Sequence, residues 1–185
     1  DAPVVSIVSR LVGHKGTDLV VQALDGIVEC GCQLLVLGQG ETHYENAFRE
    51  AQARWPGHVS AQITYSDGLA RRVYAGSDLL LMPSRSEPCG LSQMIAMRYG
   101  TVPIVRSTGG LRDTVLPPES AEGCGFVFEQ YDAYHLLCEV RRAAQMLRQA
   151  PDEFAALRRR GMTKDFSWDV SAREYLRIYE SISGR

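Results

Sequence analysis

Two cations and one carboxylate are the side chains of this sequence that could act together on an anionic ligand: Arg10, Lys15 and Glu87. Arg10 and Lys15 belong to the polar turn 9–16, whose two glycines would let the backbone come close to a ligand. A guanidinium presents a planar fork to two phosphate oxygens, and a lysine ammonium acts as a compact point charge. Together they could neutralise a diphosphate and stabilise it as a leaving group, at on the order of 3 kcal/mol per donor. A solvated basic turn is the alternative interpretation of this segment taken alone.

Glu87 lies in the segment 84–93, which follows an apolar run closed by Pro83 and precedes an amphipathic stretch that ends at Tyr99. A strand that ends in such a loop and is followed by a helix is how an open α/β sheet presents polar groups to a ligand. The helix start would leave the backbone amides of Gly90, Leu91 and Ser92 unpaired, which suits a phosphate or a sugar hydroxyl. The alternative for Glu87 is an ordinary surface carboxylate.

Three further segments follow predicted strands. Gly38-Gln39-Gly40-Glu41 lacks the third glycine of a dinucleotide fingerprint and follows the second strand, so we expect a sharp turn beside the ligand and no nicotinamide site. Thr108-Gly109-Gly110 could line the ligand or form a simple strand-to-helix turn. Tyr65 ends a strand, where it could stack on a nucleobase; packing into the core is the more frequent fate of such a tyrosine.

The elements that must position these residues alternate between strand and helix. We expect strands at 4–8, 33–37, 59–65, 78–82, 102–105 and 125–128. We expect a first helix that begins at a cap formed by Thr17 or Asp18, and a helix that ends at Tyr99. Further helices are expected at about 43–55, 67–75, 133–149, 151–160 and 168–181. This alternation with short loops predicts an α/β fold, a parallel sheet of about six strands with helices on both faces. The carboxyl ends of parallel strands share one edge, so the four polar loops should converge there. These loops are 10–16, 38–41, 83–90 and 106–110.

Length and composition limit the remaining possibilities. At 185 residues the chain fits a single domain, 1–185, and its formal charge of −2 argues against a broad nucleic-acid-binding face. No apolar run approaches the roughly 20 residues needed to cross a membrane. The chain opens with Asp1 and no basic stretch leading into an apolar one, so we expect a cytoplasmic or plastid protein.

The cysteines and carboxylates do not form a recognisable metal-binding pattern. The five cysteines are irregularly spaced and are expected to be reduced thiols, although Cys30 and Cys32 could be half of a zinc site. The sequence contains no Asp-x-Asp pair to hold a divalent metal beside a diphosphate, and no P-loop motif. We therefore expect no metal site.

The chain resembles the C-terminal domain of bacterial glycogen synthases and plant starch synthases, in motifs that occur in order along its whole length. These motifs are 9–16 (SRLVGHKG), 74–78 (YAGSD), 82–91 (MPSRSEPCGL), 98–103 (RYGTVP), 108–111 (TGGL) and 165–168 (DFSW). Many related retaining glycosyltransferases carry a second glutamate eight residues after the first, where this sequence has Ile95. Glycogen synthases generally lack that second glutamate, so Ile95 favours this branch.

The resemblance implies a GT-B enzyme with two Rossmann-like domains, of which this chain would be the nucleotide-sugar-binding half. The implied reaction transfers glucose from ADP-glucose, with retention and without a metal, to the non-reducing 4-hydroxyl of an α-1,4-glucan. By this resemblance Arg10 and Lys15 would hold the diphosphate and stabilise the departing ADP. Glu87 would address the glucosyl unit. The other implied donor-binding residues are Tyr65, which would stack on adenine, and Cys89, Gly90, Leu91, Thr108, Gly109 and Gly110.

The family's N-terminal domain, which supplies the acceptor-binding surface, is absent from this sequence. We therefore expect the isolated chain to bind ADP or ADP-glucose weakly and not to elongate glucan. The last helix, about 168–181, would pack toward that domain and would otherwise expose an apolar strip bearing Tyr175, Ile178 and Tyr179. Two alternatives stay open: a UDP-glucose-dependent retaining enzyme of the sucrose- or trehalose-phosphate type, and a non-catalytic nucleotide-binding module.

Overall fold

The computed structural model describes residues 2–184, which form a parallel sheet covered by helices, as predicted. The strands are β1 Val4–Val8, β2 Gln33–Leu37, β3 Val59–Gln62, β4 Leu79–Met82, β5 Val102–Arg106 and β6 Phe126–Phe128. The α-helices are α1 Thr17–Glu29, α2 Thr42–Arg54, α3 Asp67–Gly76, α4 Ser92–Tyr99, α5 Gly109–Thr114, α6 Ala133–Gln149, α7 Pro151–Thr163 and α8 Trp168–Ser183. A 3-10 helix, Gly13–Lys15, precedes α1.

The order of the strands across the sheet is β3-β2-β1-β4-β5-β6, and every neighbouring pair is parallel. The chain builds outward from β1 through β2 to β3, and then returns to place β4 on the other side of β1. This reversal between β1 and β4 is a topological switch point, where the loops leaving the two strands diverge and a crevice opens. The buried hydroxyl of Ser6 on β1 donates a hydrogen bond to the Leu79 carbonyl of β4 at 3.1 Å and joins the two halves of the sheet.

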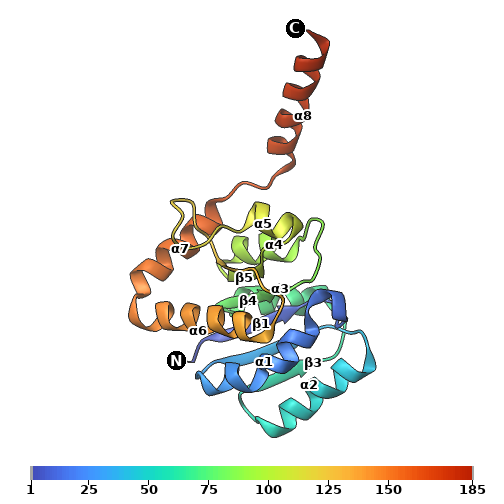
Figure 1. The fold of residues 1–185 in the computed structure, drawn as a ribbon, viewed down its shortest axis with the longest axis vertical. Coiled ribbons are helices and arrows are strands. Elements are labelled where there is room, and N and C mark those ends of the chain that lie inside the picture. Colours follow the sequence, from blue (N-terminus) through green and yellow to red (C-terminus); the bar gives the residue numbers. More distant parts are fainter. Residues whose placement is uncertain (1, 185) are drawn as a thin grey trace.

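Helices cover both faces of the sheet (Figure 1), and the apolar strands are buried on both sides for that reason. The larger core lies under α1, α2 and α6 and includes Ile27, Phe48 and Val140, all fully buried. Smaller clusters lie under α3, α4 and α5 and include Leu80 and Leu111. The sheet is thus a rigid platform that holds the loops at its carboxyl edge.

Two sequence-based boundaries are wrong in an informative way. The third strand ends at Gln62 and not at Tyr65, because the chain leaves the sheet three residues earlier to reach α3. The first helix is capped by Gly16 and not by Thr17 or Asp18. Gly16 has a φ of 76°, in the left-handed region that glycine adopts readily, and the Thr17 hydroxyl donates to the Val12 carbonyl at 3.0 Å.

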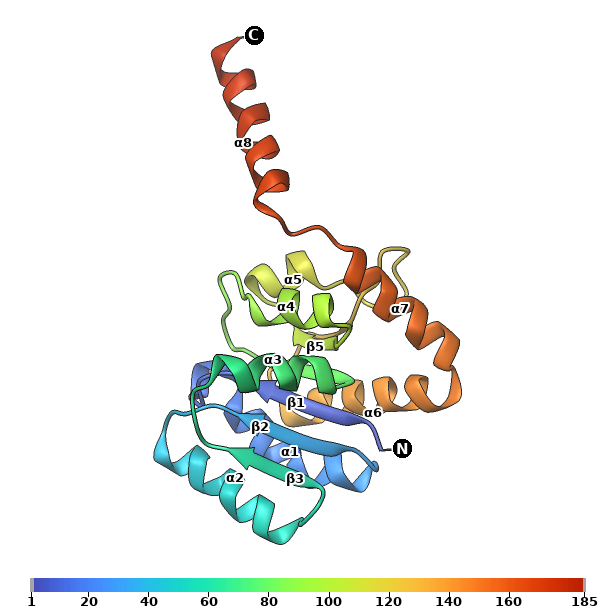
Figure 2. The same ribbon diagram turned by 180° about the vertical axis from the view of Figure 1, so that it is seen from behind.

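Helix α8 extends away from the sheet and its covering helices, as Figures 1 and 2 both show. The predicted apolar strip is exposed, since Tyr175, Ile178 and Tyr179 each keep more than half of their surface accessible. No residue of α8 is buried. None of the described helices is both long and apolar enough to cross a membrane.

Candidate functional site

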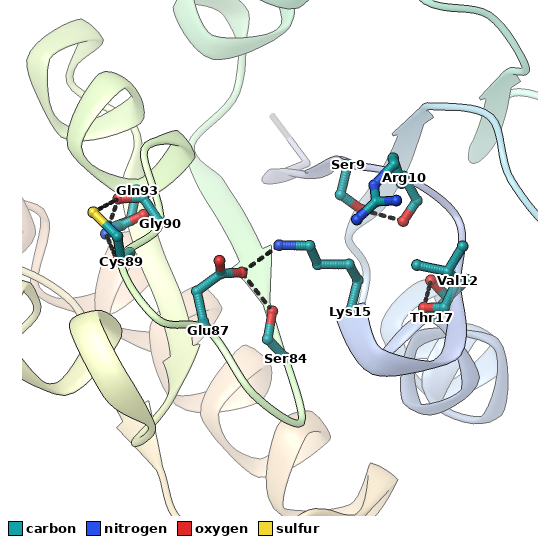
Figure 3. Close-up of polar contacts among 10 residues, drawn as sticks. All are labelled: Ser9, Arg10, Val12, Lys15, Thr17, Ser84, Glu87, Cys89, Gly90 and Gln93. Carbon is teal, nitrogen blue, oxygen red and sulfur yellow. Dashed lines mark hydrogen bonds and ion pairs between the residues drawn. The ribbon is translucent and has the colours of Figure 1, made fainter.

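Lys15 and Glu87, which are 72 residues apart in the sequence, meet at the switch point. The Lys15 Nζ atom lies 2.6 Å from the Glu87 Oε2 atom, and the Ser84 hydroxyl donates to the same oxygen at 3.1 Å (Figure 3). Lys15 comes from the loop after β1 and Glu87 from the loop after β4. The Glu87 side chain is only 8% exposed and that of Lys15 is 23% exposed, so this ion pair is largely shielded from water. The surface-carboxylate interpretation of Glu87 is therefore wrong.

Arg10 lines a small cavity together with Lys15. The cavity has a volume of about 220 Å³, and its lining includes Arg10, Lys15, Ser84 and Ser92, which starts α4. Figure 3 shows the Lys15 ammonium directed at Glu87, with Arg10 on the side of Lys15 that faces away from Glu87. Arg10 is exposed, so its guanidinium is accessible to a ligand. The structure thus places both predicted cations on one hollow beside the predicted carboxylate.

Close backbone contacts hold the loops around this cavity. A Cβ atom at Gly16 would lie 2.1 Å from the Pro83 carbonyl oxygen, so only glycine lets the first turn pack against the loop after β4. Gly109 and Gly110 begin α5 and pack in the same way against the carbonyls of Glu87 and Cys89. The Gly110 amide also donates to the Glu87 carbonyl at 3.0 Å. The segment 108–110 therefore begins a helix and at the same time supports the Glu87 loop.

Two of the three amides predicted to face a ligand are available in the part of the chain that the structure describes, since neither Gly90 nor Leu91 donates its backbone N–H to a protein acceptor. The fully buried Gln93 holds this loop: its Nε2 atom donates to the Gly90 carbonyl at 2.9 Å and to the Thr114 hydroxyl at 3.1 Å. Cys89 is exposed at the turn. The arrangement gives α4 a fixed amino terminus preceded by free donors, and Ser92 at this terminus lines the cavity.

The segment Gly38–Glu41 braces the first turn through a parallel bridge between Gly40 and Leu11, and it does not form the expected sharp turn. The Leu11 amide donates to the Gln39 carbonyl, and the Glu41 amide donates to the Leu11 carbonyl. The Glu41 carboxylate accepts from the Gly13 amide at 3.2 Å. These bonds make the turn that carries Arg10 and Lys15 part of the framework of the sheet edge.

Tyr131, which the sequence did not single out, ties three of these segments together. Its hydroxyl lies 2.7 Å from the Asp18 carboxylate and 3.1 Å from the Gly13 carbonyl, and its ring lies beneath the Arg85 guanidinium at 4.5 Å. Burial and the hydrogen bond to Asp18 raise the pKa of Tyr131 to about 12. Tyr131 follows β6 with no motif around it, so only its position in the fold identifies its role.

Tyr65 is 80% exposed, and its hydroxyl donates to the Asp67 carboxylate at 3.1 Å. The prediction of core packing is therefore wrong, and the reason is the early end of β3, which leaves Tyr65 in the loop outside the sheet. Strand β2 separates β3 from β1, and Tyr65 does not line the cavity of Arg10 and Lys15. Stacking on a base stays a prediction.

A larger hollow, of about 560 Å³, lies on the outer side of α4 and is lined by residues that include Ile95, Arg98, Lys164 and Phe166. It is mainly apolar and contains none of the three predicted catalytic side chains. The smaller cavity is the better site for an anionic ligand because both predicted cations and Ser92, the first residue of α4, line it. Within residues 2–184, no group of three or more His, Cys, Asp or Glu side chains is arranged to hold a metal ion.

Comparisons with known proteins relate the chain to one family of enzymes. The family described as glycosyl transferases group 1 matches residues 1–153. The glycogen synthase of Desulfitobacterium hafniense is 47% identical over 184 residues, which are 98% of this chain and 39% of that protein. The glycogen synthase of Kosmotoga olearia is 49% identical over 189 residues, 100% of this chain and 40% of that protein. The chain thus spans about two fifths of the length of these relatives.

Solved structures give the same relationship. The catalytic domain of starch synthase IV from Arabidopsis thaliana, bound to ADP and acarbose, superposes with a TM-score of 0.90 at 34% identity. This match covers 100% of the chain and 39% of that structure. The sucrose-phosphate synthase of Thermosynechococcus elongatus matches with a TM-score of 0.75 over 100% of the chain and 46% of its own, but at 24% identity it shows the fold alone.

Proposed function

The chain belongs to the family of group 1 glycosyl transferases, and on that premise we propose that it is the donor-binding half of a glycogen or starch synthase. In this proposal the complete enzyme transfers glucose from ADP-glucose to the non-reducing 4-hydroxyl of an α-1,4-glucan, with retention. The relatives named glycogen synthase and the starch synthase structure with ADP and acarbose support this substrate class. The proposed location is the cytoplasm for a bacterial protein, or a plastid for a plant one.

One observation carries the proposal: Lys15 and Arg10 line one cavity at the switch point of the sheet, and Glu87 pairs with Lys15 beside it. When the bond between glucose C1 and the diphosphate breaks, negative charge develops on the departing ADP. Arg10 and Lys15 would stabilise that charge without moving, since both already face the cavity. The free amides of Gly90 and Leu91 would add neutral donors to the phosphate or sugar oxygens.

Glu87 has a different role, because a carboxylate repels a diphosphate and attracts sugar hydroxyls. Its contacts with Lys15 and Ser84, which both line the cavity, hold it in place beside that cavity, where it would accept hydrogen bonds from the glucosyl unit. Thr108 and the Gly109-Gly110 turn, together with Cys89, would line the same pocket. Tyr65 would stack on adenine from the loop after β3. No resident metal enters this scheme, in which protein cations neutralise the diphosphate.

The proposal predicts donor binding without elongation by this chain alone. Acceptor alignment and the exclusion of water need surfaces beyond the two fifths of the relatives' length that this chain spans. We expect calorimetric titration to detect ADP and to give little response to UDP. Tighter binding of UDP than of ADP would favour a UDP-glucose-dependent enzyme, and glucan extension by the purified 185-residue chain would refute the need for a second domain.

A second experiment separates an enzyme half from a non-catalytic module. The chain is joined to the N-terminal domain of a glycogen synthase relative, and the transfer of labelled glucose from ADP-glucose to glycogen is measured. The matched control carries Lys15→Met in the same fusion. Extension by the first fusion and its loss in the control would support the proposal. A folded fusion that binds ADP and shows no extension would favour a binding module.

A further inference from the structure

Two cysteines lie in contact at the edge of the sheet opposite the donor site. Cys30 caps the carboxyl end of α1, and Cys32 directly precedes β2, so both lie at the amino edge. Their sulfur atoms are 3.6 Å apart, and all five cysteines of the chain are free thiols. Gly31 between them has a φ of 79°, so the backbone turns sharply and brings the two side chains together.

Arg148 of α6 fixes this turn from outside. Its guanidinium donates to the Cys30 carbonyl at 3.0 Å and to the Gly31 carbonyl at 2.8 Å. A Cβ atom at Gly31 would lie 2.9 Å from the same guanidinium, so a larger residue would disturb the contact. The two sulfurs are therefore held near each other by the backbone and by a long-range contact.

The two thiols differ in exposure and in acidity. Cys30 is half-buried, whereas Cys32 is fully buried. The hydrogen bond with Cys32 lowers the pKa of Cys30, and the charges of Arg148 and Arg141 act in the same direction while burial opposes them. The same hydrogen bond and burial raise the pKa of Cys32. Cys30 is thus the more accessible and the more acidic of the two thiols, and Cys32 is a thiol that a reagent in solution does not reach directly.

We propose that Cys30 and Cys32 form a dithiol modification site that exchanges with small disulfides such as oxidised glutathione, with Cys30 as the attacking thiol and Cys32 as the resolving thiol. A disulfide bond is about 2.05 Å long, so the sulfurs need to approach by only about 1.5 Å. With a single residue between them, the two Cα atoms lie within about 7 Å, close to the range that a bridge requires. The site is independent of the proposed glucosyl transfer.

The exchange balances in two steps. The Cys30 thiolate attacks one sulfur of the small disulfide, forms a mixed disulfide and releases one small thiolate. The Cys32 sulfur then attacks the Cys30 sulfur, forms the Cys30–Cys32 disulfide and releases the second thiolate, which takes up the Cys32 proton. Two protein thiols are oxidised and one small disulfide is reduced to two thiols. The bridge closes a small, strained ring, so excess dithiothreitol should reverse it readily.

The test uses the full chain and oxidised glutathione, with acid quenching and peptide mapping by mass spectrometry. We expect the wild-type peptide that contains both cysteines to lose two hydrogens. Cys32→Ser should instead accumulate glutathione on Cys30, and Cys30→Ser should do neither. Cys138 is half-buried like Cys30 and serves as the internal reference; Cys30 should react at least about 10-fold faster.

Two results with the wild-type chain would overturn the proposal: stable retention of glutathione on Cys30, or reaction of Cys30 no faster than that of Cys138. Because Cys32 is fully buried, a serine there could prevent folding. Cys32→Ala removes the resolving thiol without adding a buried hydroxyl, and it should trap the same mixed disulfide. A folded alanine variant with no adduct on Cys30 would equally exclude Cys30 as the attacking thiol.

Discussion

Replacing Lys15 by methionine tests the site most directly. The substitution removes the ammonium but keeps an unbranched side chain of similar length. In the structure this ammonium lies 2.6 Å from the Glu87 carboxylate and lines the cavity together with Arg10. If the cavity binds a diphosphate, Lys15→Met removes one of two cations from it and should weaken ADP binding.

The expected size of the effect follows from the contact that is lost. A hydrogen bond to a charged group contributes about 1.5–3 kcal/mol, which corresponds to an ADP dissociation constant about 10- to 150-fold higher. The stability should also fall, because Glu87 keeps only the Ser84 hydroxyl from its two partners. Breaking a fully buried pair costs about 3–5 kcal/mol. Lys15 is 23% exposed, so water can compensate in part and we expect a loss of about 1–2 kcal/mol.

The assay is calorimetric titration of ADP, with the free energy of unfolding measured in parallel by chemical denaturation. The control is Lys164→Met, the same change outside the cavity, where the ammonium donates to the Thr114 carbonyl at 3.4 Å. Glu87→Gln should not weaken ADP binding. It removes the carboxylate that competes for Lys15 and repels the diphosphate, so ADP affinity should stay equal or increase.

A folded Lys15→Met variant that binds ADP within about twofold of wild type would exclude a contact between Lys15 and the diphosphate, since even the smallest expected contribution exceeds that ratio. An equal loss of affinity in Lys164→Met would also exclude it, because the effect would then reflect net charge and not the cavity. A large loss of affinity in Glu87→Gln would mean that Glu87 contacts the nucleotide itself.

Three further predictions concern Tyr131, Gly16 and helix α8. Tyr131→Phe should lower the free energy of unfolding by about 1 kcal/mol at neutral pH; no change would exclude a bracing role for its hydroxyl. Burial and Asp18 raise the pKa of Tyr131 from 10.0 to about 12, so the unfolded chain loses this proton first and stability falls as the pH rises through that interval. In Tyr131→Phe the stability should fall less over this pH interval. An equal fall in the variant and in the wild type would contradict the role given to Tyr131. Gly16→Ala should cost clearly more than Gly57→Ala, because both have a φ near 77° but a Cβ meets a backbone carbonyl only at Gly16; equal denaturation midpoints would refute the close packing. Deleting α8 should leave the unfolding midpoint unchanged, since no residue of the helix is buried, and should abolish any concentration-dependent association seen by sedimentation; a lower midpoint would show that α8 packs on the domain.

The architecture could be predicted from the sequence because each buried strand is a short apolar run. The runs at 4–8 and 33–37 match β1 and β2 residue for residue, and the glycine- and proline-rich loops mark where the strands end. The strand boundary at Tyr65 was wrong because an aromatic residue at the end of a run fits both a strand and an exposed loop. Burial of that side chain depends on where the chain turns toward α3, which local pattern does not encode.

The polar loops could be assigned to one edge of a parallel sheet from the sequence, and their residue types suggested an anionic ligand. Which loops touch could not be assigned, because that depends on the order of strands. Lys15 meets Glu87 only because β4 lies beside β1. Tyr131 contacts the first turn only because the chain that follows β6 passes beside that turn. Strand order and long-range contacts are set by how all the helices and strands pack at once, whereas composition and periodicity report only whether each segment is buried.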